Sequence, residues 1–203
     1  ELFVEQVEQI VWQYKLAQET INLPSRAAVP EIQVFSIQLK TAELHRDVLR
    51  CIDGAVPFPI IFELHQGEGE RAQTQVVAAY KRPAISSRGT SGKADTSSWV
   101  LSDYFATNWL PATAARSSLP LGIDMAVLYE ALLQRLLPLG AQPQEALADL
   151  IVRVEQVAAK RRVIEKAQAR MAREKQFNRR VEINAHLRQL KNELEELTGR
   201  DNA

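Results

Sequence analysis

The hydrophobic and polar positions at the start of the chain change from a helical period to a strand-like one. Between residues 2 and 16, apolar side chains recur three and four positions apart, which predicts an amphipathic helix. Residues 31–40 instead alternate, so that Phe35, Ile37 and Leu39 lie on one apolar face. Alternation of β-branched and aromatic residues with polar ones is typical of a strand with one buried face. The chain is therefore expected to begin with a helix followed by a strand.

Further along, short apolar segments are separated by turn residues, which is typical of a domain that mixes helices and strands. Thr41 is the expected N-cap of the next helix, and a turn at 67–70 makes the strands on either side of it a hairpin. The Ser- and Gly-rich residues 83–97 are expected to form a loop. The predicted elements are a helix at 42–53, strands at 58–65, 76–82 and 99–109, and a helix at 123–138.

Together these elements predict an α+β domain over residues 1–138, with a small mixed four-stranded sheet and packed helices. If the strands at 31–40 and 58–65 are parallel, they form a right-handed crossover unit with the helix between them.

The pattern changes after Pro143. Residues 144–198 contain neither Gly nor Pro and predict one long helix of roughly 80 Å, within a coiled-coil-like extension over 144–203. An interruption near 159–163 or 172–178 stays open, because the apolar stripe is weak in the middle. That weak part consists of Ile164, Met171, Phe177 and Val181.

The 3-4 spacing of apolar residues along this extension favours packing against a partner helix. We therefore assign the seam to binding a protein partner, or a second copy of the chain. The residues assigned to this role are Leu150, Val154, Val157, Ile164, Leu187, Leu190, Leu194 and Leu197.

Charge is balanced overall but not locally. The chain has 25 basic and 25 acidic residues, which excludes a uniformly basic nucleic-acid-binding protein. Residues 153–180, however, contain ten basic and three acidic residues, a net charge of +7. Such a segment binds phosphates, lies in solvent as a charged helix face, or contacts an acidic protein. The residues assigned to nucleic acid are Lys160, Arg161, Arg162, Lys166, Arg170, Arg173, Arg179 and Arg180.

Few residues of the sequence suggest a disulfide, a metal site or a catalytic site. The single cysteine, Cys51, excludes an intramolecular disulfide, and three histidines at unsuitable spacing predict no metal site. We also expect no cofactor and no catalytic residue. A weaker alternative is a degenerate nuclease, with Lys40 at a strand end and Glu63 nearby, but the neutral Gln38 stands where such a site needs a carboxylate. No apolar run is long enough to span a membrane. The unpaired cysteine and the acidic first residues, which do not resemble a secretory signal, predict a cytoplasmic location.

Three motifs carry a resemblance to a family: TINL at residues 20–23, the stretch at 57–62, and EKQFNR at 174–179. In order and spacing, across nearly the whole chain, the sequence resembles the bacterial family known as domain of unknown function 4391. The resemblance implies no established activity. It does imply genes that lie beside those for helicases and DNA methyltransferases, in restriction-modification-like and phage-defence clusters.

The leading hypothesis is a non-enzymatic accessory subunit of such a complex, which binds a helicase or methyltransferase through the long C-terminal helix. The alternative, from a different class, is a DNA-binding module that uses the basic face at 153–180. The degenerate nuclease is the third hypothesis.

Overall fold

The computed structural model describes residues 2–84 and 99–199. Its internal contacts divide the chain into two compact units, Glu1–Leu137 and Pro138–Ala203. Most of the predicted loop at 83–97 lies outside the described residues.

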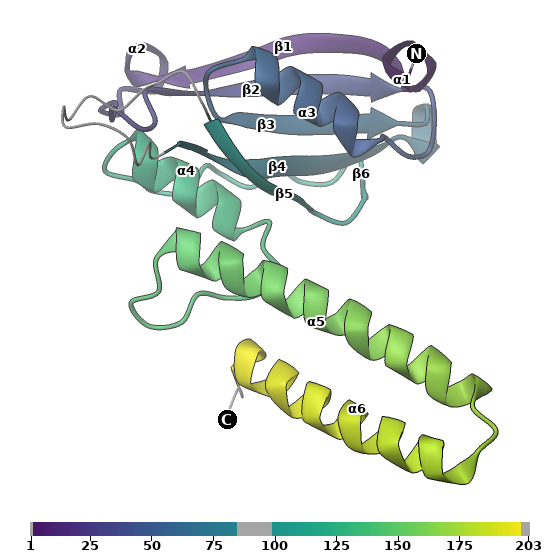
Figure 1. Cartoon of the computed structure of the whole chain (residues 1–203). Coiled ribbons are helices and arrows are strands. Elements are labelled where there is room, and N and C mark those ends of the chain that lie inside the picture. The colour runs from purple at the N-terminus through teal and green to yellow at the C-terminus, as the bar shows by residue number, and fades with distance from the viewer. Residues whose placement is uncertain (1, 85–98, 200–203) are drawn as a thin grey trace. The chain divides into compact units, whose positions relative to one another are not determined.

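The first unit contains a mixed sheet with helices, which confirms the α+β class (Figure 1). The strands lie in the order β1-β2-β3-β4-β5, and β6 pairs with β4. The predicted number of four strands is wrong, because β1 and β6 add two. The elements are α1 (Leu2–Gln6), β1 (Val7–Ala17), α2 (Gln18–Ile21), β2 (Glu31–Leu39), α3 (Arg46–Ala55), β3 (Ile60–Gln66), the 3₁₀ turn η1 (Gly69–Arg71), β4 (Gln73–Pro83), β5 (Trp99–Ala106), β6 (Leu110–Pro111) and α4 (Met125–Gln134).

The predicted helix at 2–16 is wrong, because most of this segment forms β1 at the edge of the sheet. β1 pairs antiparallel with β2, with Ile10 opposite Ile37. Its register shifts between Val7 and Gln9 and again between Trp12 and Tyr14. Each shift inserts a residue and breaks the strict alternation of a strand. The apolar positions then resemble a helical spacing, although their β-branched and aromatic types favour a strand.

β2 and β3 are parallel, which meets the condition for a crossover unit over residues 31–66 with a helix between the strands. That helix, α3, begins at Arg46 rather than at residue 42. Its N-cap is His45, not Thr41, and the His45 Nδ1 accepts a hydrogen bond from the Asp47 N–H at 3.3 Å. Buried apolar residues of α3 and the sheet form one core, which includes Val48, Leu49, Ile37, Leu39, Ile60, Phe62, Leu64 and Val77.

The hairpin after the crossover is also confirmed, since β3 and β4 pair antiparallel through the turn that contains η1. The helix predicted at 123–138 is the shorter α4. Asp124 caps its N-terminus by accepting a hydrogen bond from the Val127 N–H at 3.0 Å.

The second unit is a helical hairpin and not the single predicted helix. α5 (Leu147–Arg173) and α6 (Phe177–Thr198) pack against each other along their length (Figure 1). The chain leaves the helical conformation at Glu174 and Gln176, whose φ and ψ angles are extended. The Glu174 carboxylate accepts a hydrogen bond from the Gln176 N–H at 2.9 Å. The turn therefore forms without glycine or proline, inside the 172–178 interval that the sequence left open.

Candidate nucleic-acid interface

The apolar seam of the second unit is used within the hairpin. Ile164 on α5 packs with Leu187 and Leu190 on α6 in one buried cluster, and Leu194 packs against them. Apolar contact along facing stripes is what holds two helices together. Four of the eight residues assigned to a protein partner thus contact one another in the folded chain. Of the other four, Leu150, Val154 and Val157 are buried and Leu197 is half-buried.

Arg153 closes the base of the hairpin. Its guanidinium forms two hydrogen bonds of 2.7 Å to the Glu145 carboxylate in the loop before α5. It also donates to the backbone carbonyls of Gly140, at 2.7 Å, and Leu197, at 3.2 Å. The bonds from Arg153 lower the pKa of Glu145 to about 2. This arginine therefore joins the entry loop to the end of α6, and its charge is already neutralised.

Lys160, one of the residues assigned to nucleic acid, also acts within the hairpin. Its Nζ lies 2.5 Å from a Glu193 carboxylate oxygen on α6. A hydrogen-bonded ion pair across two helices orients them, and it leaves little charge for a ligand. The structure therefore separates Lys160 from the rest of the assigned set.

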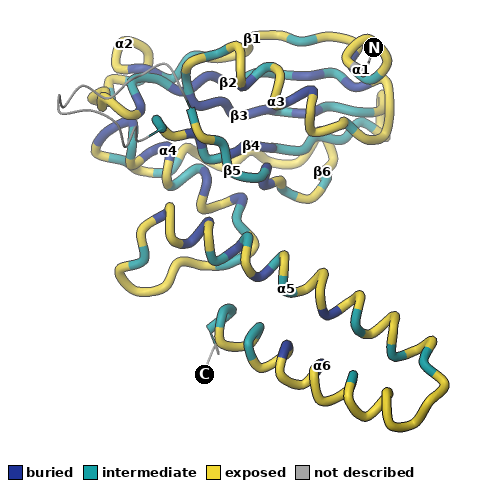
Figure 2. Tube along the Cα trace, in the orientation of Figure 1, coloured by how far each residue is buried: buried dark blue, intermediate teal, exposed yellow. Residues whose placement is uncertain are grey.

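The other seven assigned residues are exposed, and they lie on the outside of the hairpin, which Figure 2 shows as largely exposed towards its tip. Four of them, on α5, follow one another at intervals of four, four and three residues. Such spacing places side chains on one face of a helix. That row consists of Arg162, Lys166, Arg170 and Arg173, and Arg161 lies beside it on α5. Arg179 and Arg180 are on the first turn of α6.

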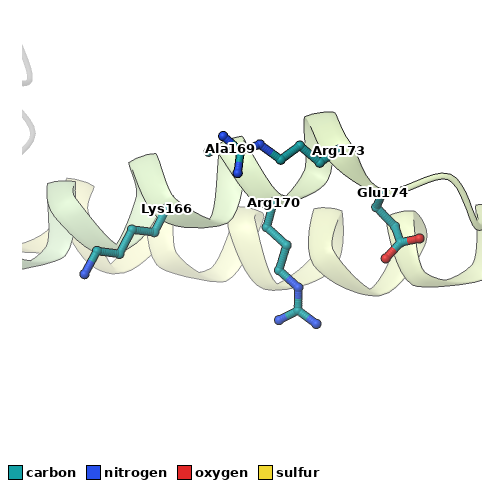
Figure 3. Close-up of a pocket in the computed structure, with 5 residues that line it drawn as sticks. All are labelled: Lys166, Ala169, Arg170, Arg173 and Glu174. Atoms are coloured by element: carbon teal, nitrogen blue, oxygen red, sulfur yellow. The ribbon is translucent and has the colours of Figure 1, made fainter.

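The row ends in a shallow, open hollow of about 380 Å³ at the hairpin tip, lined by Lys166, Ala169, Arg170, Arg173 and Glu174. In Figure 3 the Lys166 and Arg170 side chains extend away from the α5 backbone, while the Arg173 side chain runs back towards Ala169.

Glu174 is the acidic group in this hollow, and its carboxylate is bound to the turn. The pKa of Glu174 is lowered, first by the Gln176 N–H and further by the charges of Arg170 and Arg179. Arginines from both helices therefore act on the same point of the tip. Residues 166–181 contain six basic residues and one acidic residue, a net charge of +5. We call these residues the basic tip.

The basic tip also contains two exposed apolar side chains that the sequence pattern did not single out. Phe177, the first residue of α6, is 78 % exposed, and Val181, one turn later, is 53 % exposed. Both were interpreted as members of a continuous seam. Because the chain reverses at residues 174–176, they do not belong to the buried cluster of the hairpin. The exposed phenylalanine among arginines could have been found only by placing the turn.

The first unit holds a buried polar cluster of a different kind. The Lys81 ammonium, 1 % exposed, donates to the backbone carbonyls of Asp53 and Val56 at the end of α3. It lies 3.6 Å from an Asp53 carboxylate oxygen, and the Tyr104 hydroxyl donates to the other oxygen at 2.5 Å. Burial lowers the pKa of Lys81 and raises that of Asp53, while their attraction opposes both shifts.

A cation beside the last carbonyls of a helix stabilises the helix end. Since every charge of this cluster has a partner, we interpret the cluster as structural.

The nuclease alternative gains no support from the structure. Lys40 donates to the Val4 carbonyl at 2.8 Å, and Glu63 is bound by Arg116 at 3.2 and 3.3 Å. Within residues 2–84 and 99–199, no three His, Cys, Asp or Glu side chains gather closely enough to hold a metal ion. In the same ranges, no helix is both long and apolar enough to cross a membrane.

Comparison with known proteins gives one match. Neither the curated proteins nor the solved structures contain a match to the chain. The family described as a domain of unknown function (DUF4391) matches residues 1–194, which is nearly the whole length. The protein therefore belongs to the DUF4391 family.

Proposed function

We propose that the second unit binds the phosphate backbone of DNA through the basic tip of its hairpin. The observation that carries this proposal is that apolar and basic residues of the second unit have different environments. Ile164, Leu187, Leu190 and Leu194 of the apolar seam pack within the hairpin, whereas arginines near the turn of both helices remain exposed around one point.

The charges near the hairpin base support this division. Arg153 and Lys160 are neutralised by Glu145 and Glu193, so they contribute to folding. The net charge of +5 on residues 166–181 is concentrated over a short length of two adjacent helices. A concentrated positive charge attracts DNA because each neutralised phosphate releases bound counterions. If about five phosphates are neutralised, log K should fall with log salt concentration with a slope of about −4.

The experiment is a fluorescence anisotropy titration of labelled DNA with the whole chain and two matched variants. Arg170→Glu with Arg173→Glu alters the basic tip. Arg188→Glu with Lys191→Glu makes the same change of charge on exposed positions of α6 that lie outside it. We expect the tip variant to lose at least tenfold in affinity and the control variant to lose much less. Equal losses in the two variants would contradict the proposal, since net charge alone would then explain binding.

A second role, as an accessory subunit of a helicase or DNA methyltransferase complex, is favoured by a different observation. β1 lies at the sheet edge, and two of its aromatic side chains, Trp12 and Tyr14, are 60 % and 52 % exposed. An edge strand with exposed aromatic residues can extend its sheet with a strand of another protein. The partner class comes from the family resemblance.

The test of this role is co-purification from cells that express the chain with a candidate helicase or methyltransferase. Trp12→Ser with Tyr14→Ser should release the partner if β1 is the contact. Leu190→Asp with Leu194→Asp, which should open the hairpin, reports whether the seam is needed instead. Retention of the partner by both variants would contradict both modes of binding.

A further inference from the structure

We infer that Phe177 stacks on an unpaired base, so that the basic tip prefers single-stranded DNA to duplex DNA. This inference rests on the proposed function and specifies its ligand. The starting observation is that the largest apolar side chain of the tip is 78 % exposed, at the turn where the two helices meet.

An exposed phenylalanine contributes little to the folding of the hairpin. The buried cluster of this unit is formed by Ile164, Leu187 and Leu190, with four half-buried neighbours that do not include Phe177. A phenylalanine contributes favourable free energy mainly when its ring is buried away from water. Because the Phe177 ring is still exposed in the folded chain, a ligand that covers it would obtain this favourable free energy.

The surroundings of Phe177 fit a base attached to a charged backbone. The neighbouring exposed residues Lys175, Arg179 and Arg180 are basic and lie within three positions of it. Bases stack on aromatic rings while cationic side chains follow the phosphates, which is the common arrangement in proteins that bind single strands. The core of a protein–protein interface is, by contrast, depleted of charged residues other than arginine.

The backbone at this point adds donors of hydrogen bonds. Gln176, the N-cap of α6, provides no side-chain cap for the first turn of the helix. The first N–H groups of a helix have no partner within it, and phosphates bind readily there. Phe177 lies in that first turn, so a ring and phosphate-binding groups occur together.

In a duplex, each base already stacks on its neighbours, and Phe177 reaches one only if the base pair opens. The arginines contact the phosphates of both forms, so they do not discriminate between them. The preference for single strands should therefore depend on the ring, whereas the affinity for both forms should depend on the arginines. Base stacking on an aromatic ring corresponds to roughly 5- to 150-fold in affinity.

The experiment measures the affinity of the full chain for one labelled oligonucleotide, alone and annealed to its complement. Phe177→Ala should lose at least fivefold on the single strand and little on the duplex, whereas Phe177→Trp should retain the preference. Val163→Ala is the matched control, because it removes apolar atoms from an exposed position of the hairpin outside the basic tip without removing a ring. A difference fluorescence spectrum of Phe177→Trp against the parent chain should show quenching by the single strand.

The outcomes separate this inference from the proposed function. If Phe177→Ala binds both forms as the parent does, the ring is not a contact and the inference is wrong. An equal loss on both forms would also overturn it, since the residue would then support the tip rather than stack. In either case, a loss caused by Arg170→Glu with Arg173→Glu would leave phosphate binding intact as the proposed function. No binding of the parent chain to either form would refute both.

Discussion

The two units of this protein use charge in opposite ways. In the first unit, Asp53 on α3 and Lys81 on β4 are both buried and neutralise each other between the helix and the sheet. In the second unit, Ile164, Leu187 and Leu190 form a small buried cluster between the two helices, and most of the charges remain on the surface of the hairpin. A charge that is buried and paired serves folding, whereas an exposed set of like charges is available for a ligand. Composition alone does not distinguish these cases.

The units also differ in how many contacts support each element. β2, β3 and β4 have neighbouring strands on both sides, so their backbone groups are held by several neighbours. α6 packs mainly against α5 and is held at its end by the Arg153 guanidinium. Elements with few supporting contacts open more readily. We therefore expect the hairpin to open before the sheet unfolds.

The largest effect should follow from breaking the buried pair of the first unit. Lys81→Met leaves the Asp53 carboxylate buried without its cation and removes the contacts with the end of α3. Removal of one partner of a buried pair costs about 3–5 kcal/mol. Urea denaturation of the whole chain, followed by near-ultraviolet circular dichroism, should show this loss of unfolding free energy. Adding Asp53→Asn should restore part of it, and no restoration would mean that the charges are not coupled.

A smaller effect, confined to the second unit, should follow from truncating its seam. Leu187→Ala removes a buried side chain from the cluster with Ile164, and such changes cost about 2–5 kcal/mol. Because the two helices can relax into the cavity that the substitution leaves, we expect a loss of unfolding free energy at the lower end of that range. Hydrogen exchange should become faster in α5 and α6 while the sheet stays protected. Val163→Ala, at an exposed position of α5, is the matched control. Faster exchange throughout the sheet would contradict the independence of the two units.

The smallest effect concerns pH. The folded-state pKa of Glu145 is lowered to about 2, so this group stabilises the hairpin above its ordinary pKa of 4.5. That contribution should disappear as the pH falls from 4.5 towards 2, since the unfolded chain takes up the proton first. Glu145→Gln should weaken the hairpin at neutral pH and flatten this dependence, measured by thermal melts of helical circular dichroism. If the variant had the same pH profile as the parent, the ion pair between Arg153 and Glu145 would not stabilise the hairpin.

Local pattern was sufficient to predict the centre of the first unit. Residues 31–40 alternate regularly, and the apolar run after α3 is short and β-branched, which favours a buried strand over a helix. The edge strand β1 was missed because two irregularities in its pairing with β2 remove the period on which the prediction depends. Single-residue insertions of this kind are set by the neighbouring strand and are not visible in one segment alone.

The helical conformation and the basic excess of the second unit were predicted, but its folding into a hairpin was not. The basic residues were identified correctly as a local excess, yet the turn that gathers them at one end was left open. It is formed by Glu174 binding the Gln176 N–H rather than by glycine or proline. Because that turn was not placed, Phe177 was assigned to the seam, and the packing of Ile164 against Leu187 and Leu190 within the chain was not predicted.

The most direct test of the central claim, that the basic tip binds DNA phosphates, is the salt dependence of binding. The affinity of the whole chain for a labelled single strand should be measured over a range of salt concentrations, for the parent and for Arg170→Glu with Arg173→Glu. On a single strand, each phosphate contact that is lost reduces the slope of log K against log salt by about 0.7. We predict a slope smaller by about 1.4 in the variant, together with weaker binding. An unchanged slope would contradict it, because these arginines would then not contact the DNA.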